Sequence, residues 1–393
     1  MEHLEQPQAK KAKVEKLVPL GNIATSCSDK ALAWLIDPVT VADFTSTYWD
    51  SRPLLISRHK PEYFEGLVVT EKAIKLLTDD QSAEDFELSA AEKKMSWLHA
   101  LVERLENFTG TLWSSSYHYC QHAPTTQDFF SCDTKEANTI LIQLTGTCHW
   151  RAADDSDSTL FQIDSLLYPG DTLYLPQTAA ASSLVTSGPC SYVILRTVAE
   201  SWGDFLLQAL PEVIPRLLAS DPDFQRSLPL NWTSSVGLCV KENDLKLKPT
   251  LEALLAKIAT SMDFVDLADQ QAMDITIART PPAPRKGAAS TFGPDPRLHA
   301  CTVRLRNPAW VRVAAAEGED GEHVTLIVTS VGNDIKKHGE AGDEPQIIEL
   351  SGNDKVPALR ELFQSWPEFA GAGSLGLELT TALWEGGILE TRV

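Results

Sequence analysis

The sequence lacks the features that mark secreted and membrane proteins. Its seven cysteines are an odd number at scattered positions with no CxxC pair, which favours reduced thiols over a disulfide framework. No apolar stretch reaches the length of a membrane span, and the first residues have no apolar region typical of a secretory signal. We therefore expect a protein of the nucleus, nucleolus or cytoplasm that is not secreted and has no membrane partner.

Positive charge is also scarce. The chain of 393 residues has 34 Lys and Arg against 54 Asp and Glu, so its formal net charge is -20. Neutralising phosphates requires a Lys/Arg surface, so we expect no direct binding of nucleic acid. Only residues 10–16 are locally basic. This run has two interpretations, a solvated disordered segment or a nuclear import signal. The acidic balance favours protein or small-molecule partners.

The hydrophobic content of 43% is enough to bury a sizeable core, divided into two or three units. Helical spacing of apolar residues predicts helices such as Lys94 to Leu105, whereas short runs between Gly110 and Thr197 are typical of the strands of a small barrel or jelly roll. We predict four segments, which are a flexible leader (1–28), a barrel domain (29–205), a helical region with a Pro-rich linker (206–290) and a last mixed domain (291–393).

Four motifs in order carry a family resemblance. They are Tyr48 to Ile56, Leu141 to Arg151, Ser201 to Leu207 and Leu379 to Trp384. Together they resemble the ribosomal oxygenases, JmjC proteins that hydroxylate histidines of ribosomal proteins with iron(II) and 2-oxoglutarate. The resemblance implies an α+β fold with a JmjC cupin barrel (a double-stranded β-helix, or jelly roll), then a helical dimerisation unit and a winged-helix-like C-terminal domain.

The metal positions of that family are altered in this chain. A non-haem iron oxygenase holds its metal with two histidines and one carboxylate. The motifs place Asp133 and Ala181 at the histidine positions and Lys135 at the carboxylate position. A protonated Lys135 cannot coordinate and opposes a divalent cation, and it could instead pair with Asp133. We therefore predict no catalytic residue and no metal ligand.

The positions for the cosubstrate are altered as well. The family lysine that pairs with 2-oxoglutarate corresponds to Cys148, and the neighbouring Asn and Tyr correspond to Tyr119 and Gln121. We therefore predict no cofactor, with Fe(II) and 2-oxoglutarate expected only if the chain is an active enzyme after all.

Two further sets of residues could bind a metal ion. His118, Cys120 and His122 alternate along one predicted strand, so they share a face that could bind zinc with one further ligand. By the same alternation, however, Tyr119 and Gln121 are the pocket-facing positions, so this trio points away from the barrel interior, which favours packing on the outer face. A site built from Asp128, Cys132 and Asp133 is a weaker alternative. The sequence has no Gly-x-Ser-x-Gly, phosphate-binding Gly-rich loop or His-Glu-x-x-His motif.

Three functions remain open. The favoured hypothesis is a catalytically inactive relative that serves as an interaction or assembly protein, with ribosomal or chromatin proteins as the partner class. The alternatives are an active protein histidyl hydroxylase or lysine demethylase, and a cupin that binds a peptide or metabolite without chemistry. The resemblance also implies homodimerisation through the helical region, and a heterodimer with an active relative is a further alternative.

Overall fold

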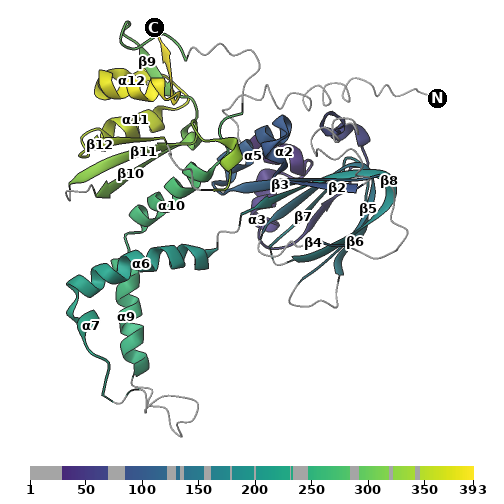
Figure 1. Ribbon diagram of the computed structural model, residues 1–393, viewed down its shortest axis with the longest axis horizontal. Coiled ribbons are helices and arrows are strands. Elements are labelled where there is room, and N and C mark those ends of the chain that lie inside the picture. The colour runs from purple at the N-terminus through teal and green to yellow at the C-terminus, as the bar shows by residue number, and fades with distance from the viewer. Residues whose placement is uncertain are drawn as a thin grey trace. The chain divides into compact units, whose positions relative to one another are not determined.

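The computed structural model shown in Figure 1 describes most of the chain. The described residues are 29–69, 85–121, 130–132, 137–154, 161–177, 179–198, 201–230, 232, 247–283, 292–317, 322–340 and 346–393. The chain forms two compact units, one of residues 1–199 with 273–393 and the other of residues 200–272. The predicted boundaries after residues 28, 205 and 290 stay predictions. Among the described helices, none is long and apolar enough to cross a membrane.

A curved eight-stranded sheet occupies the first half of the chain. Six strands follow the order β1-β7-β5-β8-β3-β2, while β4 pairs with β8 and β6 pairs with β5. All of the pairs are antiparallel. The bounds are β1 Leu54–Ile56, β2 Asp85–Ser89, β3 Trp113–Cys120, β4 Phe130–Cys132, β5 Thr139–Asp154, β6 Phe161–Leu167, β7 Thr172–Leu175 and β8 Ala179–Thr197.

The two longest strands, β5 and β8, join both layers of this sheet. The first residues of β5 pair with β7 and the later ones with β6, while β8 runs beside β5 throughout. The register shifts at three places between Gln143 and Cys148, where the strand bends. The strands therefore enclose a shared interior, and the predicted α+β class with a cupin barrel is confirmed.

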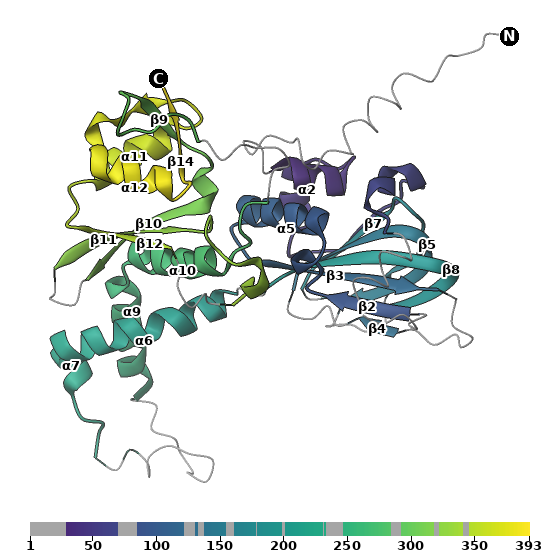
Figure 2. The same cartoon turned by 45° about the horizontal axis from the view of Figure 1, so that its top comes forward.

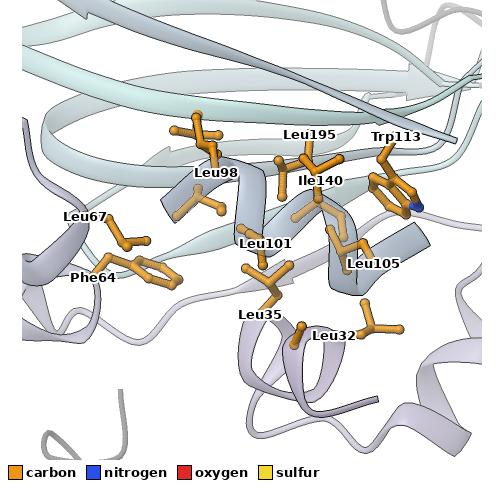
Figure 3. Close-up of a cluster of buried hydrophobic side chains, with 14 of the residues drawn as sticks. Leu32, Leu35, Phe64, Leu67, Leu98, Leu101, Leu105, Trp113, Ile140 and Leu195 are labelled. Atoms are coloured by element: carbon orange, nitrogen blue, oxygen red, sulfur yellow. The ribbon is translucent and has the colours of Figure 1, made fainter. Parts of the chain in front are cut away.

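Helices cover the outer face of one layer, as Figure 2 shows for α2 (Asp29–Ile36) and α5 (Ser96–Thr109) over the sheet. In α5, the buried Leu98, Leu101 and Leu105 recur at helical spacing and so form one apolar stripe. Figure 3 shows this stripe between the side chains of α2 and those of the sheet. The helix ends at Gly110, whose φ of 77° is a left-handed conformation that favours glycine. The remaining helical segments here are α3 Val41–Thr47, η1 Pro61–Tyr63, η2 Glu65–Leu67 and η3 Ala91–Lys93.

The second unit is helical. Ser201 begins α6 (Trp202–Ser220) with a capping box, in which its side chain and that of Asp204 each accept from the other's backbone N–H. The other described helices are α7 Pro222–Gln225, α9 Leu247–Ser261 and α10 Phe264–Ala278, the last of which continues into the first unit. The buried side chains of this unit come from α6, α9 and α10, namely Ala209, Val213, Leu217, Ile258 and Leu267.

The C-terminal region contains two three-stranded antiparallel sheets, with the orders β10-β11-β12 and β13-β9-β14. Its core gathers the buried Trp310, Leu359 and Leu383. The winged-helix-like architecture of this region stays a prediction. The element bounds are β9 Thr302–Leu305, η4 Pro308–Trp310, β10 Val311–Glu317, β11 His323–Thr329, η5 Ile335–Lys337, β12 Ile347–Ser351, α11 Val356–Ser365, β13 Ala370–Gly371, η6 Ala372–Ser374, α12 Leu377–Glu385 and β14 Leu389–Arg392.

A buried polar network joins the C-terminal region to α5 and β3. His338 is bonded through Nδ1 to Glu92 Oε1 at 3.1 Å and through Nε2 to Glu106 Oε1 at 2.7 Å. Glu92 also accepts from the Ser115 hydroxyl at 2.6 Å. Glu106 accepts from the backbone N–H of Thr280 at 2.9 Å. Each carboxylate therefore has several donors, as burial of a charge requires.

Protonation of His338 follows from this setting. Burial lowers the pKa of His338, but the hydrogen bonds to Glu106 and Glu92 outweigh it and raise the pKa to about 9. The pKa of Glu92 is pushed up by burial, yet bonds from His338 and Ser115 bring it below its ordinary value. A buried imidazolium between two carboxylates is thus the expected state at neutral pH.

We expect the free energy of unfolding to fall as pH rises through this titration. A histidine whose folded pKa is about 9, above its ordinary value of 6.5, gives stability that is complete below pH 6.5 and lost toward pH 9. Between about pH 6.5 and 8.5 the loss should be on the order of 2 kcal/mol, measured by urea unfolding. Burial lowers the pKa of His118 to about 4, so its titration lies below this window.

The matched control is His338→Gln, which keeps a hydrogen-bonding side chain but removes the titration. Its unfolding free energy should vary less over the same pH range than that of the natural chain. Equal pH dependence in the two chains would contradict the assignment of the titration to His338.

Candidate functional site

The interior of the barrel is the candidate site, because its strands carry three of the predicted positions, namely Tyr119 on β3, Cys148 on β5 and Ala181 on β8. Opposite residues in an antiparallel pair share a face, so the pairs Leu141 with Leu173 and Leu141 with Ile194 define the inward side. The buried apolar cluster on that side consists of Leu141, Cys148, Trp150, Ala152, Ile163, Leu167, Leu173, Leu175, Ala179, Ala181, Cys190 and Ile194.

Ala181, at the predicted position of the second histidine, lies in this cluster. It is buried on β8, opposite Ala152 of β5 and Cys132 of β4. A methyl side chain has no donor atom for a metal. The described neighbours therefore do not fit the iron site that the resemblance implies, and within the part of the chain that the structure describes no three His, Cys, Asp or Glu side chains could hold a metal. Asp133 and Lys135 lie outside the described residues, so the full set of altered ligands stays a prediction.

The structure corrects the predicted faces of β3. Tyr119 was expected to face the pocket, but it packs with the cluster beneath α5 on the opposite side of the sheet. The inward positions are His118 and Cys120, which pair with Tyr192 and Cys190 of β8. Successive side chains of a strand point to opposite faces, so a motif count that is off by one residue reverses every assignment. Gln121 follows the end of β3 in a bend.

His118 contacts aromatic, hydroxyl and carboxylate groups, and its Nδ1 lies 3.9 Å from Glu87 Oε2. Its ring stacks on Tyr192 with centroids 4.7 Å apart, and its Nε2 is 2.8 Å from the Ser116 hydroxyl. Burial lowers its pKa to about 4, so the imidazole is neutral at pH 7. The zinc hypothesis for His118, Cys120 and His122 stays a prediction, since His122 lies outside the described residues. The same is true of the alternative that uses Asp128 and Asp133.

Cys148, which stands where the family lysine was expected, faces the interior and is fully buried. Its Sγ lies 3.2 Å from Sγ of Cys190, and Gln143 Nε2 donates to the same Cys190 sulfur at 3.3 Å. The hydrogen bond to Cys190, with burial, raises the pKa of the Cys148 thiol well above its usual range. A neutral thiol at this position cannot balance the charge of a dicarboxylate. Sequence reasoning missed Cys190 and Gln143, because nothing in the local pattern links them to Cys148.

His149 and Arg151 point to the other side of β5 from Trp150. His149 Nε2 is hydrogen-bonded to Asp164 Oδ1, and Arg151 Nε lies 3.4 Å from Asp164 Oδ2. These partly exposed groups form an ion pair on the outside of the barrel rather than a site within it.

The turn at Pro169, Gly170 and Asp171 before β7 is held by several hydrogen bonds. The carboxylate of Asp171 is buried and accepts from the backbone N–H of Arg58 at 2.7 Å, His59 at 2.9 Å and Tyr168 at 2.9 Å. Gly170 has a φ of 94°, and a Cβ there would lie 2.1 Å from the Lys60 carbonyl oxygen. This turn therefore fixes the start of β7 against the segment that follows β1.

The chain is similar over most of its length to curated oxygenases. It is 25% identical over 431 residues to the bifunctional lysine-specific demethylase and histidyl-hydroxylase NO66 of Branchiostoma floridae, covering 95% of this chain and 70% of that protein. It is 23% identical over 449 residues to ribosomal oxygenase 1 of Danio rerio, covering 93% of this chain and 80% of the relative. The crystal structure of ycfD from Escherichia coli aligns with 14% identity and a TM-score of 0.48, over 90% of this chain and 98% of that chain. No family model matches.

We expect Gly170→Ala to destabilise the barrel by about 2 kcal/mol or more, because the new Cβ meets backbone and the φ is strained for any L-residue. Chemical denaturation of the full chain measures the loss. Gly66→Ala is the matched control, since a Cβ at Gly66 meets nothing within 4 Å. Similar losses for the two variants would show that the turn does not constrain the fold.

Proposed function

We propose that this chain, a divergent relative of the JmjC ribosomal oxygenases, acts as an interaction or assembly protein without oxygenase chemistry. The observation that carries the proposal is the apolar, thiol-containing interior around Ala181 and Cys148. An oxygenase of this kind needs metal ligands on one face and a cation for its dicarboxylate cosubstrate. Neither Ala181 nor Cys148 provides such a group, while the strands that carry them are retained.

The partner class follows from the relatives. Their names describe enzymes that act on histidine and lysine residues or on ribosomes. We propose that this chain retains a surface for a ribosomal or chromatin protein and binds it without modifying it. A nuclear or nucleolar location fits these partners and the basic residues 10–16, and a cytoplasmic location stays open.

Association through the helical unit is part of the proposal. One side of α6 is buried within the unit by Ala209, Val213 and Leu217. Its other side carries exposed apolar side chains, including Leu207 at 72% and Leu218 at 52% exposure. A helix that is apolar on both sides normally has both covered, which supports a homodimer through this unit.

A thermal-shift titration of the full chain with manganese(II) and 2-oxoglutarate tests the absence of oxygenase chemistry. We expect no rise in melting temperature, because a ligand stabilises a protein only by binding its folded state. A ligand present at 100 times its Kd would raise the free energy of unfolding by about 2.7 kcal/mol. Ribosomal oxygenase 1 of Danio rerio serves as a positive control for the assay.

A metal-dependent rise in the natural chain would contradict the proposal and favour an active hydroxylase or demethylase. The variant Asp133→His with Lys135→Asp and Ala181→His restores the family ligands. Metal uptake by this variant would show that the three ligands were all that was missing.

Light scattering of the full chain tests the dimer. We expect a dimeric mass for the natural chain and a monomeric mass for Leu207→Glu with Leu218→Glu, because burying two carboxylates in an apolar interface is costly. Ser220→Glu adds a charge at the exposed end of the same helix and should leave the dimer intact. A monomeric mass for the natural chain would contradict the proposed homodimer.

A further inference from the structure

Cys148 and Cys190 bring two buried thiols together in the barrel interior. They come from β5 and β8, and neither has exposed surface. Their sulfurs are 3.2 Å apart, so they must approach by about 1.2 Å to reach the ~2.05 Å of a disulfide bond. Both are unbridged in the structure.

The surroundings of the pair are polar on one side only. Gln143 is completely buried, and its amide nitrogen donates to Cys190 Sγ and to the carbonyl of Thr145. The amide oxygen of Gln143 is buried and has no hydrogen-bond partner among the residues that the structure describes. Leaving a buried acceptor unsatisfied costs about 1–3 kcal/mol, so this amide is not explained as apolar packing.

The pair also lies beside an irregular part of the sheet. The register of β5 and β8 shifts three times between Gln143 and Cys148, which disrupts the hydrogen-bond ladder beside the sulfurs. On β8, the neighbouring Gly188 and Pro189 are exposed, so solvent begins one residue from Cys190. Transient local unfolding of such an irregular strand pair can expose buried groups without global unfolding.

We propose that Cys148 and Cys190 are an oxidisable dithiol that a hydroperoxide converts to an intramolecular disulfide inside the barrel. The Cys190 thiolate attacks one peroxide oxygen, the O–O bond breaks, and the leaving oxygen takes up a proton, which gives a sulfenic acid and water when the oxidant is hydrogen peroxide. Cys148 then attacks the Cys190 sulfur. The S–S bond forms, the S–O bond breaks, and hydroxide leaves with the Cys148 proton as a second water. Two thiols are oxidised and one peroxide is reduced.

The roles of the two sulfurs follow from their hydrogen bonds. The bond from Cys148 lowers the pKa of Cys190, as does the Gln143 amide, although burial opposes both. The same hydrogen bond raises the pKa of the Cys148 thiol. The thiolate is the nucleophile in this chemistry, so Cys190 reacts first and Cys148 resolves the intermediate.

Differential alkylation of the natural full chain tests the proposal. The reduced chain is treated with hydrogen peroxide, the remaining thiols are blocked under denaturing conditions, and the peptides are analysed by mass spectrometry. We expect a Cys148–Cys190 linked peptide that reductant reverses, and a fall in alkylation of both residues by roughly tenfold relative to Cys301, because two thiols held together react at high effective concentration. Unchanged alkylation, or a link from Cys190 to Cys120, would overturn the proposal.

Variants then test the order of the two steps. In Cys148→Ala the intermediate cannot be resolved, so a sulfenic acid on Cys190 should be trapped by dimedone. Cys190→Ala should give no such adduct on Cys148, and Cys301→Ala should form the link as the natural chain does. An adduct on Cys148 in place of Cys190 would refute the assigned roles. The peptide analysis of the natural chain tests the proposal even if one of the variants does not fold.

Discussion

The contact on which the first unit depends is the ion pair network of His338 with Glu92 and Glu106. All three side chains are almost completely buried, so each charge is stable only while its partners are present. The same network reaches the backbone of β3 through Ser115 and the chain after α10 through Thr280. Burying three charged groups together leaves little freedom in how the C-terminal region joins the barrel. Removing one of the three side chains would leave an uncompensated charge in the core.

The barrel combines a well-bonded frame with an interior poor in ligands. Asp171 satisfies three backbone donors and so holds the turn before β7. Inside, Ala181 and Cys148 contribute a methyl group and a neutral thiol. The frame does not require metal, because its strands are held by hydrogen bonds and apolar contacts. The frame can therefore persist around an apolar interior, in which Cys148 and Cys190 lie together.

Local features of the fold were predictable where periodicity is strong. The helix expected from Lys94 to Leu105 is observed at Ser96–Thr109, because its apolar stripe recurs every three to four residues. The end of the helix was placed too early, since Gly110 rather than the last apolar residue stops it. The predicted faces of β3 were wrong for Tyr119 and His118. Strand faces depend on pairing with β8, which a motif count along one strand does not contain.

The sequence by itself determined the family resemblance, the barrel strands and the chemistry that single residues exclude. An alanine at position 181 offers no metal ligand in any fold, and a thiol at position 148 carries no positive charge. Only the tertiary structure decided which distant side chains meet. Cys148 and Cys190 are 42 positions apart and His338 and Glu106 are 232 apart, so no local pattern couples them. Their contacts arise from strand register and core packing, which are properties of the whole chain.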